Sequence, residues 1–184
     1  MPHREVVIDA CCTLKLLATE RAEAIVRALE WQLVDTPHVS VEPMCLWTPP
    51  DVDGVRAKRP TSTELLRATG LLGTRALDTE ALIDAFVAAA ARINDADASC
   101  IALAGVLGLP LVTDDRKERR IAIEMFPSTE LVSTLDVLHE ASIRIGWSAS
   151  ELAQAAKNLR WGGNFAPPNK DPRAGWYSTL LART

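Results

Sequence analysis

The chain has 184 residues, of which 48% are hydrophobic and 24% charged, and its formal net charge is −4. These values are typical of one soluble globular domain with a sizeable core. Its apolar runs fall short of the roughly 20 residues that cross a bilayer, and residues 1–5 lead straight into a predicted strand, so we expect a cytoplasmic protein with no membrane contact. The acidic balance excludes a surface coated in basic charge, although a local basic patch can still attract nucleic acid.

The cysteines and histidines do not form a recognisable metal-binding or catalytic pattern. The three histidines are far apart in the sequence, and the four cysteines lack paired spacing: they are Cys11, Cys12, Cys45 and Cys100. A zinc site or a histidine-based triad is therefore disfavoured. We expect the cysteines to be small buried apolar side chains.

Short apolar runs alternate with helical patterns along the chain. We predict strands over 6–10, 31–35, 109–113 and 129–133. Helices are expected over 14–29, near 39–42, and over 65–72, 78–93, 97–107, 116–125, 135–145 and 148–160. Gly108 and Gly146 are predicted to end two of these helices. Thr61 with Glu64, and Ser148 with Glu151, are predicted to form capping boxes at the start of two others. This alternation predicts a single α/β domain over 1–184, a three-layer α/β/α, Rossmann-like fold around a central parallel sheet.

Two segments do not fit the alternation of strands and helices. Residues 47–60 are rich in proline and charge and are predicted to form a loop. Residues 161–184 contain several aromatic residues and are predicted to form an irregular tail packed on the core.

Acidic residues stand where the predicted strands end. Asp9 closes the first strand, Asp114 and Asp115 close the third, and Asp97 lies on the apolar stripe of the helix over 97–107. Parallel strands bring their carboxyl ends to one edge of a sheet, and anions gathered there repel each other unless a cation lies between them. The sequence therefore predicts a divalent-metal site.

Each of these acids also has a structural interpretation. Asp9 and Asp95 are well placed to cap helices. Only one of two adjacent side chains normally enters a crevice, so we favour Asp115 over Asp114 as the ligand. Glu42 is the weakest candidate from physical arguments alone, since it also fits a solvated position beside Pro43.

A basic run follows the Asp114–Asp115 pair. The charges of Arg116, Lys117, Arg119 and Arg120 fit an ordinary exposed helix face, but beside an acidic crevice they would also hold a phosphodiester backbone. The hydroxyl of Thr113 is a further candidate for orienting a ligand or a water.

Together these residues resemble the PIN domain, a nuclease fold of many toxin–antitoxin toxins and other RNA-processing proteins. The resemblance extends from Val6 to the helix after Ser133, through four acid-bearing motifs: Ile8-Asp9-Ala10, Pro37 to Glu42, Asp97 to Ala104, and Leu111 to Lys117. The last two motifs are specific as a pair, whereas the first two are weak alone.

The resemblance implies an Mg²⁺- or Mn²⁺-dependent endoribonuclease of the kind found as the toxin of toxin–antitoxin pairs. Its catalytic residues would be Asp9, Glu42, Asp97 and Asp115, with Asp9, Asp97, Asp115 and Asp114 as metal ligands. It also implies an RNA substrate, a small antitoxin partner and a homodimer. We expect substrate discrimination to lie in the segment 47–60.

Two other classes compete with this interpretation. Phosphoryl transfer through a covalent aspartate is disfavoured, because a haloacid-dehalogenase-type site needs a second Asp where the chain has Cys11. The second is a catalytically inactive PIN-like scaffold that only binds partners. Retained acids argue against it, since an idle cluster of buried anions is destabilising.

Overall fold

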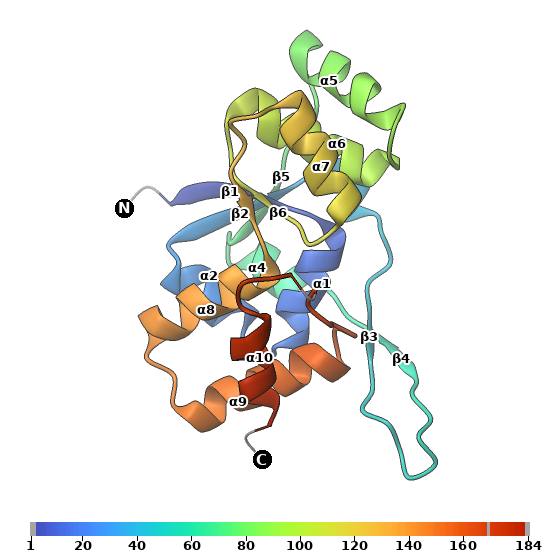
Figure 1. The fold of residues 1–184 in the computed structure, drawn as a ribbon. Helices are drawn as coiled ribbons and strands as arrows, with labels where there is room; N and C mark the ends of the chain where they lie inside the picture. Colours follow the sequence, from blue (N-terminus) through green and yellow to red (C-terminus); the bar gives the residue numbers. More distant parts are fainter. Residues whose placement is uncertain (1–2, 169, 183–184) are drawn as a thin grey trace.

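A five-stranded parallel sheet forms the centre of the computed structural model, which describes residues 3–168 and 170–182 (Figure 1). Its order is β5-β2-β1-β6-β7. These strands are β1 (Arg4–Ile8), β2 (Trp31–Asp35), β5 (Leu72–Thr74), β6 (Leu111–Val112) and β7 (Leu131–Val132). The central strand β1 has Val6, Val7 and Ile8 fully buried, as expected for a strand covered on both faces.

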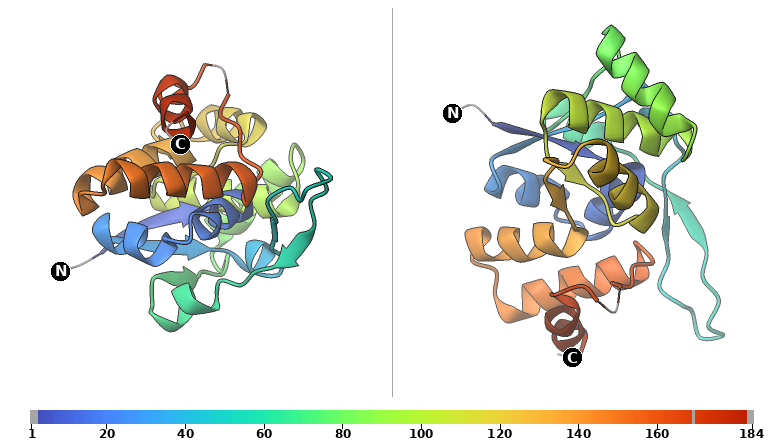
Figure 2. Two further views of the ribbon diagram at one scale, coloured as in Figure 1. Left: turned by 90° about the horizontal axis from the view of Figure 1, so that it is seen from below. Right: turned by 45° about the horizontal axis from the view of Figure 1, so that its top comes forward.

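Helices cover both faces of this sheet. Alternate residues of β1 point to opposite sides, so Val6 and Ile8 join one apolar core and Val7 joins the other. The first core is closed by α1 (Ala10–Ala18), α2 (Ala22–Ala28), α4 (Glu64–Ala68), α8 (Thr134–Ile145), α9 (Ala149–Trp161) and α10 (Ala174–Leu181). The second is closed by α3 (Pro37–Ser40), α5 (Glu80–Ala90), α6 (Asp95–Leu107) and α7 (Arg116–Met125). The predicted three-layer α/β/α fold is confirmed (Figure 2).

Several helix ends follow the predicted signals. Gly108 and Gly146 end α6 and α8 in the left-handed conformation, with φ of 65° and 71°. The predicted capping box of Ser148 and Glu151 begins α9. The predicted helix over 14–29 is divided into α1 and α2, because the chain turns at Glu20, whose φ is 60°.

Three short strands were missed by the sequence interpretation. The segment 47–60, expected to be a loop, joins β3 (Cys45–Trp47) to β4 (Lys58–Pro60), and these two strands pair as an antiparallel hairpin. The edge strand β5 has only three residues, one of them Gly73, and therefore carries almost no periodic signal.

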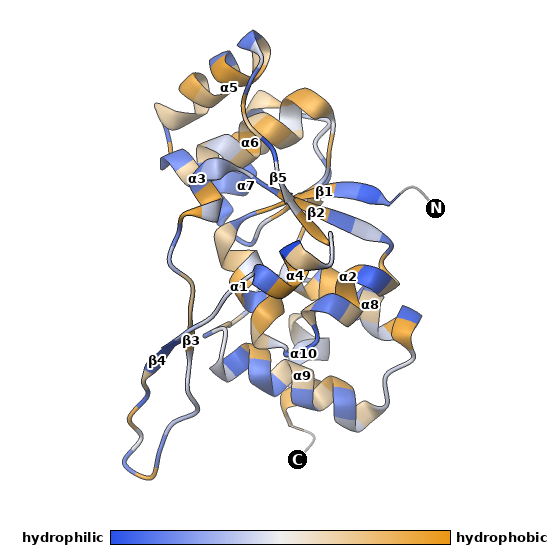
Figure 3. Cartoon of the chain, turned by 180° about the vertical axis from the view of Figure 1, so that it is seen from behind, coloured by the Kyte–Doolittle hydropathy of each residue, from blue (hydrophilic) through white to orange (hydrophobic). Residues whose placement is uncertain are grey.

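The tail is packed on the core as expected, but it is not irregular throughout. Residues 174–181 form α10, in which Tyr177 is 1% exposed and donates a hydrogen bond to the carbonyl of Ala156 at 3.0 Å. Figure 3 shows the resulting distribution of hydropathy, with polar residues at the start of β1 and apolar residues in the centre of the sheet. No helix within 3–168 and 170–182 is long and apolar enough to cross a membrane.

Gly105 of α6 gives a test of this packing. A Cβ placed on it would lie 2.1 Å from Cδ2 of Phe126, at the end of α7. Gly105→Ala should therefore lower the free energy of unfolding by about 1–3 kcal/mol through overpacking, although alanine is the better helix former. The matched control is Gly175→Ala in α10, where a Cβ meets nothing within 4 Å. Chemical denaturation of both variants measures the difference, and a stabilised Gly105→Ala variant would contradict the packing.

Candidate acidic site

The candidate site is built on the pairing of β1 with β6. Ile8 lies opposite Val112 in this pair, so the next residues, Asp9 and Thr113, emerge side by side at the carboxyl edge of the sheet. The backbone N–H of Asp9 donates to the Val112 carbonyl at 3.2 Å. Asp9 is only 3% exposed, and its carboxylate accepts from the backbone N–H of Cys12, so it also caps α1.

Glu118 is the member of the site that sequence reasoning missed. It lies in the first turn of α7 and is fully buried. Its Oε2 accepts a hydrogen bond from the Thr113 hydroxyl, while its Oε1 has no hydrogen-bond partner among the described residues. A buried carboxylate oxygen without a partner is costly. This orphaned atom is the feature of the site that most needs a physical explanation.

Two further carboxylates approach from helix starts. Asp97 is half-buried in the first turn of α6, where Asn94 caps the helix and also donates to the Asp97 carboxylate at 2.7 Å. Asp115 caps α7, with its Oδ1 accepting from the N–H groups of Lys117 and Glu118 at 2.7 and 2.8 Å. The second oxygen of Asp115 is left out of this cap.

Electrostatic coupling connects these groups. Burial raises the pKa of Asp9 to about 6, and it raises the pKa of Glu118 well above its ordinary value, with the charge of Asp9 as the next cause. Asp97 and Asp115 also raise the pKa of Glu118. The exposed Glu42, just beyond the end of α3, has its pKa raised by burial and by Asp97. We call these five residues the acidic cluster: Asp9, Glu42, Asp97, Asp115 and Glu118.

Asp114, the alternative ligand in the sequence interpretation, is engaged elsewhere. Its Oδ2 accepts from Lys15 at 2.7 Å and from the Thr134 hydroxyl at 2.6 Å, and its Oδ1 accepts from the Thr134 N–H. Burial alone would raise the pKa of Asp114, but Lys15 and Thr134 outweigh it and lower that pKa. These contacts join α1 to the start of α8 and leave Asp114 outside the acidic cluster.

The predicted substrate-binding residues separate into two groups. Arg119 donates to the carbonyls of Thr113 and Val132 at 2.8 and 3.3 Å, so it joins the ends of β6 and β7. Arg120 forms an exposed ion pair with Glu124 at 3.0 Å. Thr113 is buried and holds Glu118, which places its hydroxyl within the site rather than on a substrate surface.

Arg116 and Lys117 keep their charges exposed. Neither has a side-chain hydrogen bond or ion pair within the part of the chain that the structure describes. Arg116 also lines a cavity of about 340 Å³, where Arg119 and Lys170 face three carboxylates, those of Asp114, Asp136 and Asp171. Arg116 and Lys117 are therefore the cations of the basic run that remain available to an anion near the acidic cluster.

The donor set suits a hard cation, because carboxylate oxygens are the usual ligands of Mg²⁺ and Mn²⁺. The orphaned oxygen of Glu118 and the desolvated Asp9 fit such an ion. The geometry is not preassembled: within 3–168 and 170–182, no three His, Cys, Asp or Glu side chains are grouped so as to hold a metal. Carboxylates repel one another, so bringing Asp97 and Asp115 onto an ion with Glu118 requires their side chains to move.

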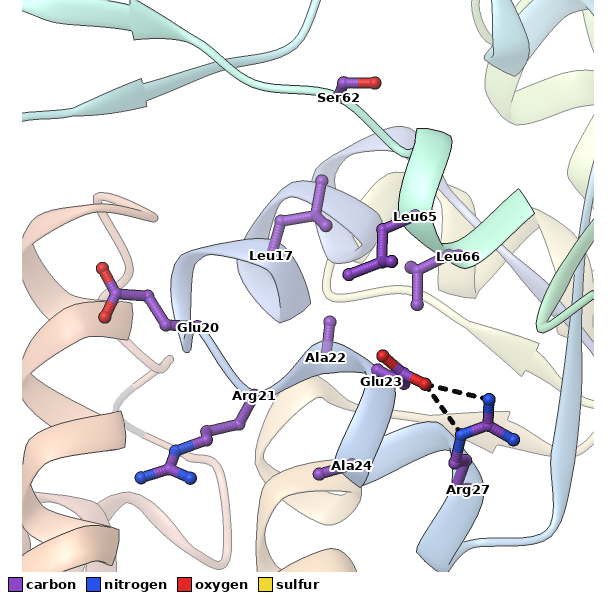
Figure 4. Close-up of a pocket in the computed structure, with 10 residues that line it drawn as sticks. All are labelled: Leu17, Glu20, Arg21, Ala22, Glu23, Ala24, Arg27, Ser62, Leu65 and Leu66. Atoms are coloured by element: carbon purple, nitrogen blue, oxygen red, sulfur yellow. Dashed lines mark hydrogen bonds and ion pairs between the residues drawn. The ribbon is translucent and has the colours of Figure 1, made fainter. Parts of the chain in front are cut away.

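A larger cavity lies away from these acids. It has a volume of about 600 Å³ and lies between the α1–α2 turn and α4, with Leu17, Leu65 and Leu66 at its apolar side (Figure 4). An ion pair between Glu23 and Arg27 lies at its edge. Since this cavity lacks the buried carboxylates described above, its size alone does not make it the reactive site.

The sequence does contain a signal for Glu118. Glu118, Ile121, Ala122 and Met125 follow helical spacing, and the last three belong to the core on the α6–α7 side of the sheet. A glutamate on an apolar stripe is a buried charge, and buried charges are rare without a partner. The dense charges of residues 116–120 concealed this pattern.

Comparison with known proteins gives no assignment: no family model, no curated protein and no solved structure matches the chain.

The buried carboxyl of Asp9 makes stability depend on pH. Its folded pKa of about 6 exceeds the ordinary value of 3.8, so the folded state holds this proton more tightly than the unfolded chain does. Its stabilising effect is complete below about pH 4 and is lost as the pH rises through 6, a change of roughly 3 kcal/mol without metal. Asp9→Asn keeps a capping side chain and should remove this component. Urea unfolding from pH 4 to 8 with a chelator measures the difference, and parallel profiles would contradict a raised pKa.

Proposed function

We propose that this protein is a metal-dependent endoribonuclease of the PIN type. The observation that supports this most strongly is the buried pair of Asp9 and Glu118, held on either side of Thr113, with one carboxylate oxygen left without a partner. Four acid-bearing motifs occur in the order expected for that family, and their side chains interact electrostatically at one edge of the sheet.

The energetic argument for a cation is direct. Two carboxylates buried near each other are each penalised by desolvation and by mutual repulsion. Proteins commonly relieve such a penalty with a basic partner, but Lys15, whose charge lowers the pKa of Asp9, forms its ion pair with Asp114. A divalent cation would satisfy Oε1 of Glu118 and neutralise both groups.

The residues divide into roles around the RNA backbone. Asp9, Glu118, Asp97 and Asp115 would hold Mg²⁺ or Mn²⁺, which when bound neutralises phosphate charge and makes a bound water more acidic. Thr113 fixes the carboxylate of Glu118. Glu42, which is exposed and has its pKa raised by burial and by the charge of Asp97, would accept a proton from the attacking water.

The flanking phosphates would be held by the exposed cations. Arg116 and Lys117 begin α7, directly after Asp115, and so stand beside the acidic cluster. Their positive charges keep an RNA backbone near carboxylates that would otherwise repel it. A role as the toxin of a pair, with a small antitoxin and a homodimer, is proposed on the family resemblance alone.

The competing function is a PIN-like binding module without catalysis. One observation favours it: among the described residues, no three potential ligands are grouped as a metal site. The two functions differ in whether the protein binds a divalent cation and cleaves RNA, so the experiments below separate them.

The first experiment measures cleavage of total RNA with Mn²⁺ and with EDTA. Wild-type protein should cleave only with the metal, and Asp97→Asn should reduce the rate by at least about a hundredfold, because one electrostatic group of such a site contributes that much. The matched control is Asp95→Asn, which removes an exposed carboxylate two residues away on the same helix turn. Equal activity in Asp97→Asn and wild type would reject the assignment.

The second experiment measures metal binding without an activity readout. A ligand at a hundredfold excess over its Kd stabilises the folded state by about 2.7 kcal/mol. Mn²⁺ should therefore raise the melting temperature of the wild type, and this increase should be largely lost in Glu118→Gln, which retains an oxygen for the Thr113 hydroxyl. Superimposed melting curves of the wild type with and without Mn²⁺ would favour the binding module.

A further inference from the structure

A second polar and aromatic site lies between the β3–β4 hairpin and α9. Trp47 of β3 and Trp161 at the end of α9 come together there, although 114 positions separate them in the printed sequence. The Arg56 guanidinium lies over both indoles, with its Cζ 5.1 Å from the ring centre of Trp47 and 5.7 Å from that of Trp161. Residues from distant parts of the chain thus form one aromatic and cationic surface.

Hydrogen bonds hold this surface in place. The N–H of Trp47 donates to the Gly162 carbonyl at 2.9 Å. Arg56 donates to the carbonyls of Thr48 and Trp161 and to the Asn164 side chain. The hairpin is therefore fixed against the end of α9, and the two indoles need little ordering before they bind a ligand.

More positive charge surrounds the indoles. Lys58 lies 5.1 Å from the ring centre of Trp47, and Arg160 lies 5.8 Å from that of Trp161. Lys157 also lines the adjoining cavity. In a chain of net charge −4, this concentration of cations is a local departure that favours an anionic ligand.

The adjoining cavity, which we call the hairpin pocket, has a volume of about 270 Å³, and the residues that line it include Trp47, Gln154, Lys157, Asn158 and Trp161. Its one acidic lining residue, Glu20, is paired with Arg59 at 3.9 Å. Gln154 donates to the Asn158 side-chain oxygen at 2.8 Å. This bond leaves the Gln154 oxygen as an acceptor and the Asn158 amide nitrogen as a donor, neither with a partner among the described residues. An adjacent acceptor and donor match the edge of a nucleobase.

A purely structural role for these residues explains only part of the arrangement. Locking the hairpin to α9 accounts for Arg56 and for the Trp47 backbone. It does not account for Trp161, a large apolar side chain that remains 42% exposed at the pocket.

We propose that the hairpin pocket binds an unpaired base of single-stranded RNA, with Trp161 as the stacking surface. Bases of single-stranded RNA are commonly held on aromatic side chains and arginine planes, while lysine and arginine follow the backbone. The size of the pocket, just below the range for drug-sized ligands, suits one base. The expected ligand is therefore an aromatic base that stacks on Trp161 and has phosphate groups on either side.

The hairpin pocket lies close to the acidic cluster along the chain. Its proposed role in binding the RNA substrate therefore rests on the proposed ribonuclease function. Trp47 follows Glu42 by five residues, a span of at most about 17 Å even if fully extended. The hairpin runs along the side of the molecule where β1 ends and α1 begins (Figures 1 and 2). An RNA strand bound at the acidic cluster would reach the pocket a few nucleotides away, which makes the pocket a determinant of single-strand specificity.

The test measures binding apart from cleavage, by fluorescence anisotropy of a labelled unstructured RNA dodecamer in EDTA. Trp161→Ala should weaken binding by about tenfold or more, the loss expected for one stacked base. Trp161→Phe retains an aromatic face and should remain close to wild type. The matched control is Trp147→Ala, which removes a partly buried indole from the turn between α8 and α9, outside the pocket.

Two further variants keep the proposal falsifiable if Trp161→Ala does not fold. Lys157→Gln should weaken binding to all sequences and reduce the salt dependence by about one charge. Asn158→Asp introduces an anion and should weaken binding while circular dichroism remains unchanged. Wild-type affinity in these folded variants, equal loss in Trp147→Ala, or equal binding of double-stranded RNA would overturn the proposal.

Failure of the pocket proposal can be distinguished from failure of the proposed catalysis. If the wild type binds single-stranded RNA in EDTA through Trp161 but never cleaves with Mn²⁺, the pocket stands and the nuclease assignment fails. If the wild type cleaves with Mn²⁺ but Trp161→Ala changes neither KM nor affinity, the pocket proposal fails alone.

Discussion

The contact of the Thr113 hydroxyl with Glu118 is the interaction on which the candidate site depends. Thr113 directly follows β6, beside Asp9, which directly follows β1, and Glu118 lies in the first turn of α7. This one hydrogen bond therefore joins the sheet edge to the helix that follows it. It also keeps a carboxylate close to Asp9 despite their repulsion. A fold selected only for stability would place an apolar residue at 118, because Ile121 and Ala122 on the same stripe are buried at little cost.

The same edge of the sheet shows how acids of similar sequence context take different roles. Asp114 and Asp115 are neighbours, yet Asp114 turns toward Lys15 and Thr134 and stabilises the packing of α1 against α8. Asp115 caps α7 and raises the pKa of Asp97 and Glu118. Alternation of side-chain direction after a strand accounts for this division, which lets one dipeptide supply both a structural ion pair and a charge at the site.

The sequence predicted the layers because their physical causes are local. β1, β2 and the glycine ends of α6 and α8 follow from runs of buried apolar residues and from the left-handed conformation that glycine accepts. The hairpin of β3 and β4 could not be predicted in this way, since Lys58–Pro60 is exposed and polar and its pairing with Cys45–Trp47 is fixed by contacts with Gly162 and Asn164. Likewise α10 is stabilised by burial of Tyr177 against α9, which is a tertiary contact.

The candidate site, like the fold, could be predicted from the sequence only in part. Positions at strand ends identify Asp9 and Asp115 from sequence, since topology alone brings them to one edge. The burial of Glu118 depends on which face of α7 meets the core, and the presence of Trp161 beside Trp47 depends on the hairpin that sequence reasoning missed. Both features arise where a segment of high charge lies against an apolar or aromatic surface. The composition of such a segment is polar even though one of its faces is buried or stacked. Its function can therefore be inferred only once the structure shows which residues form that face.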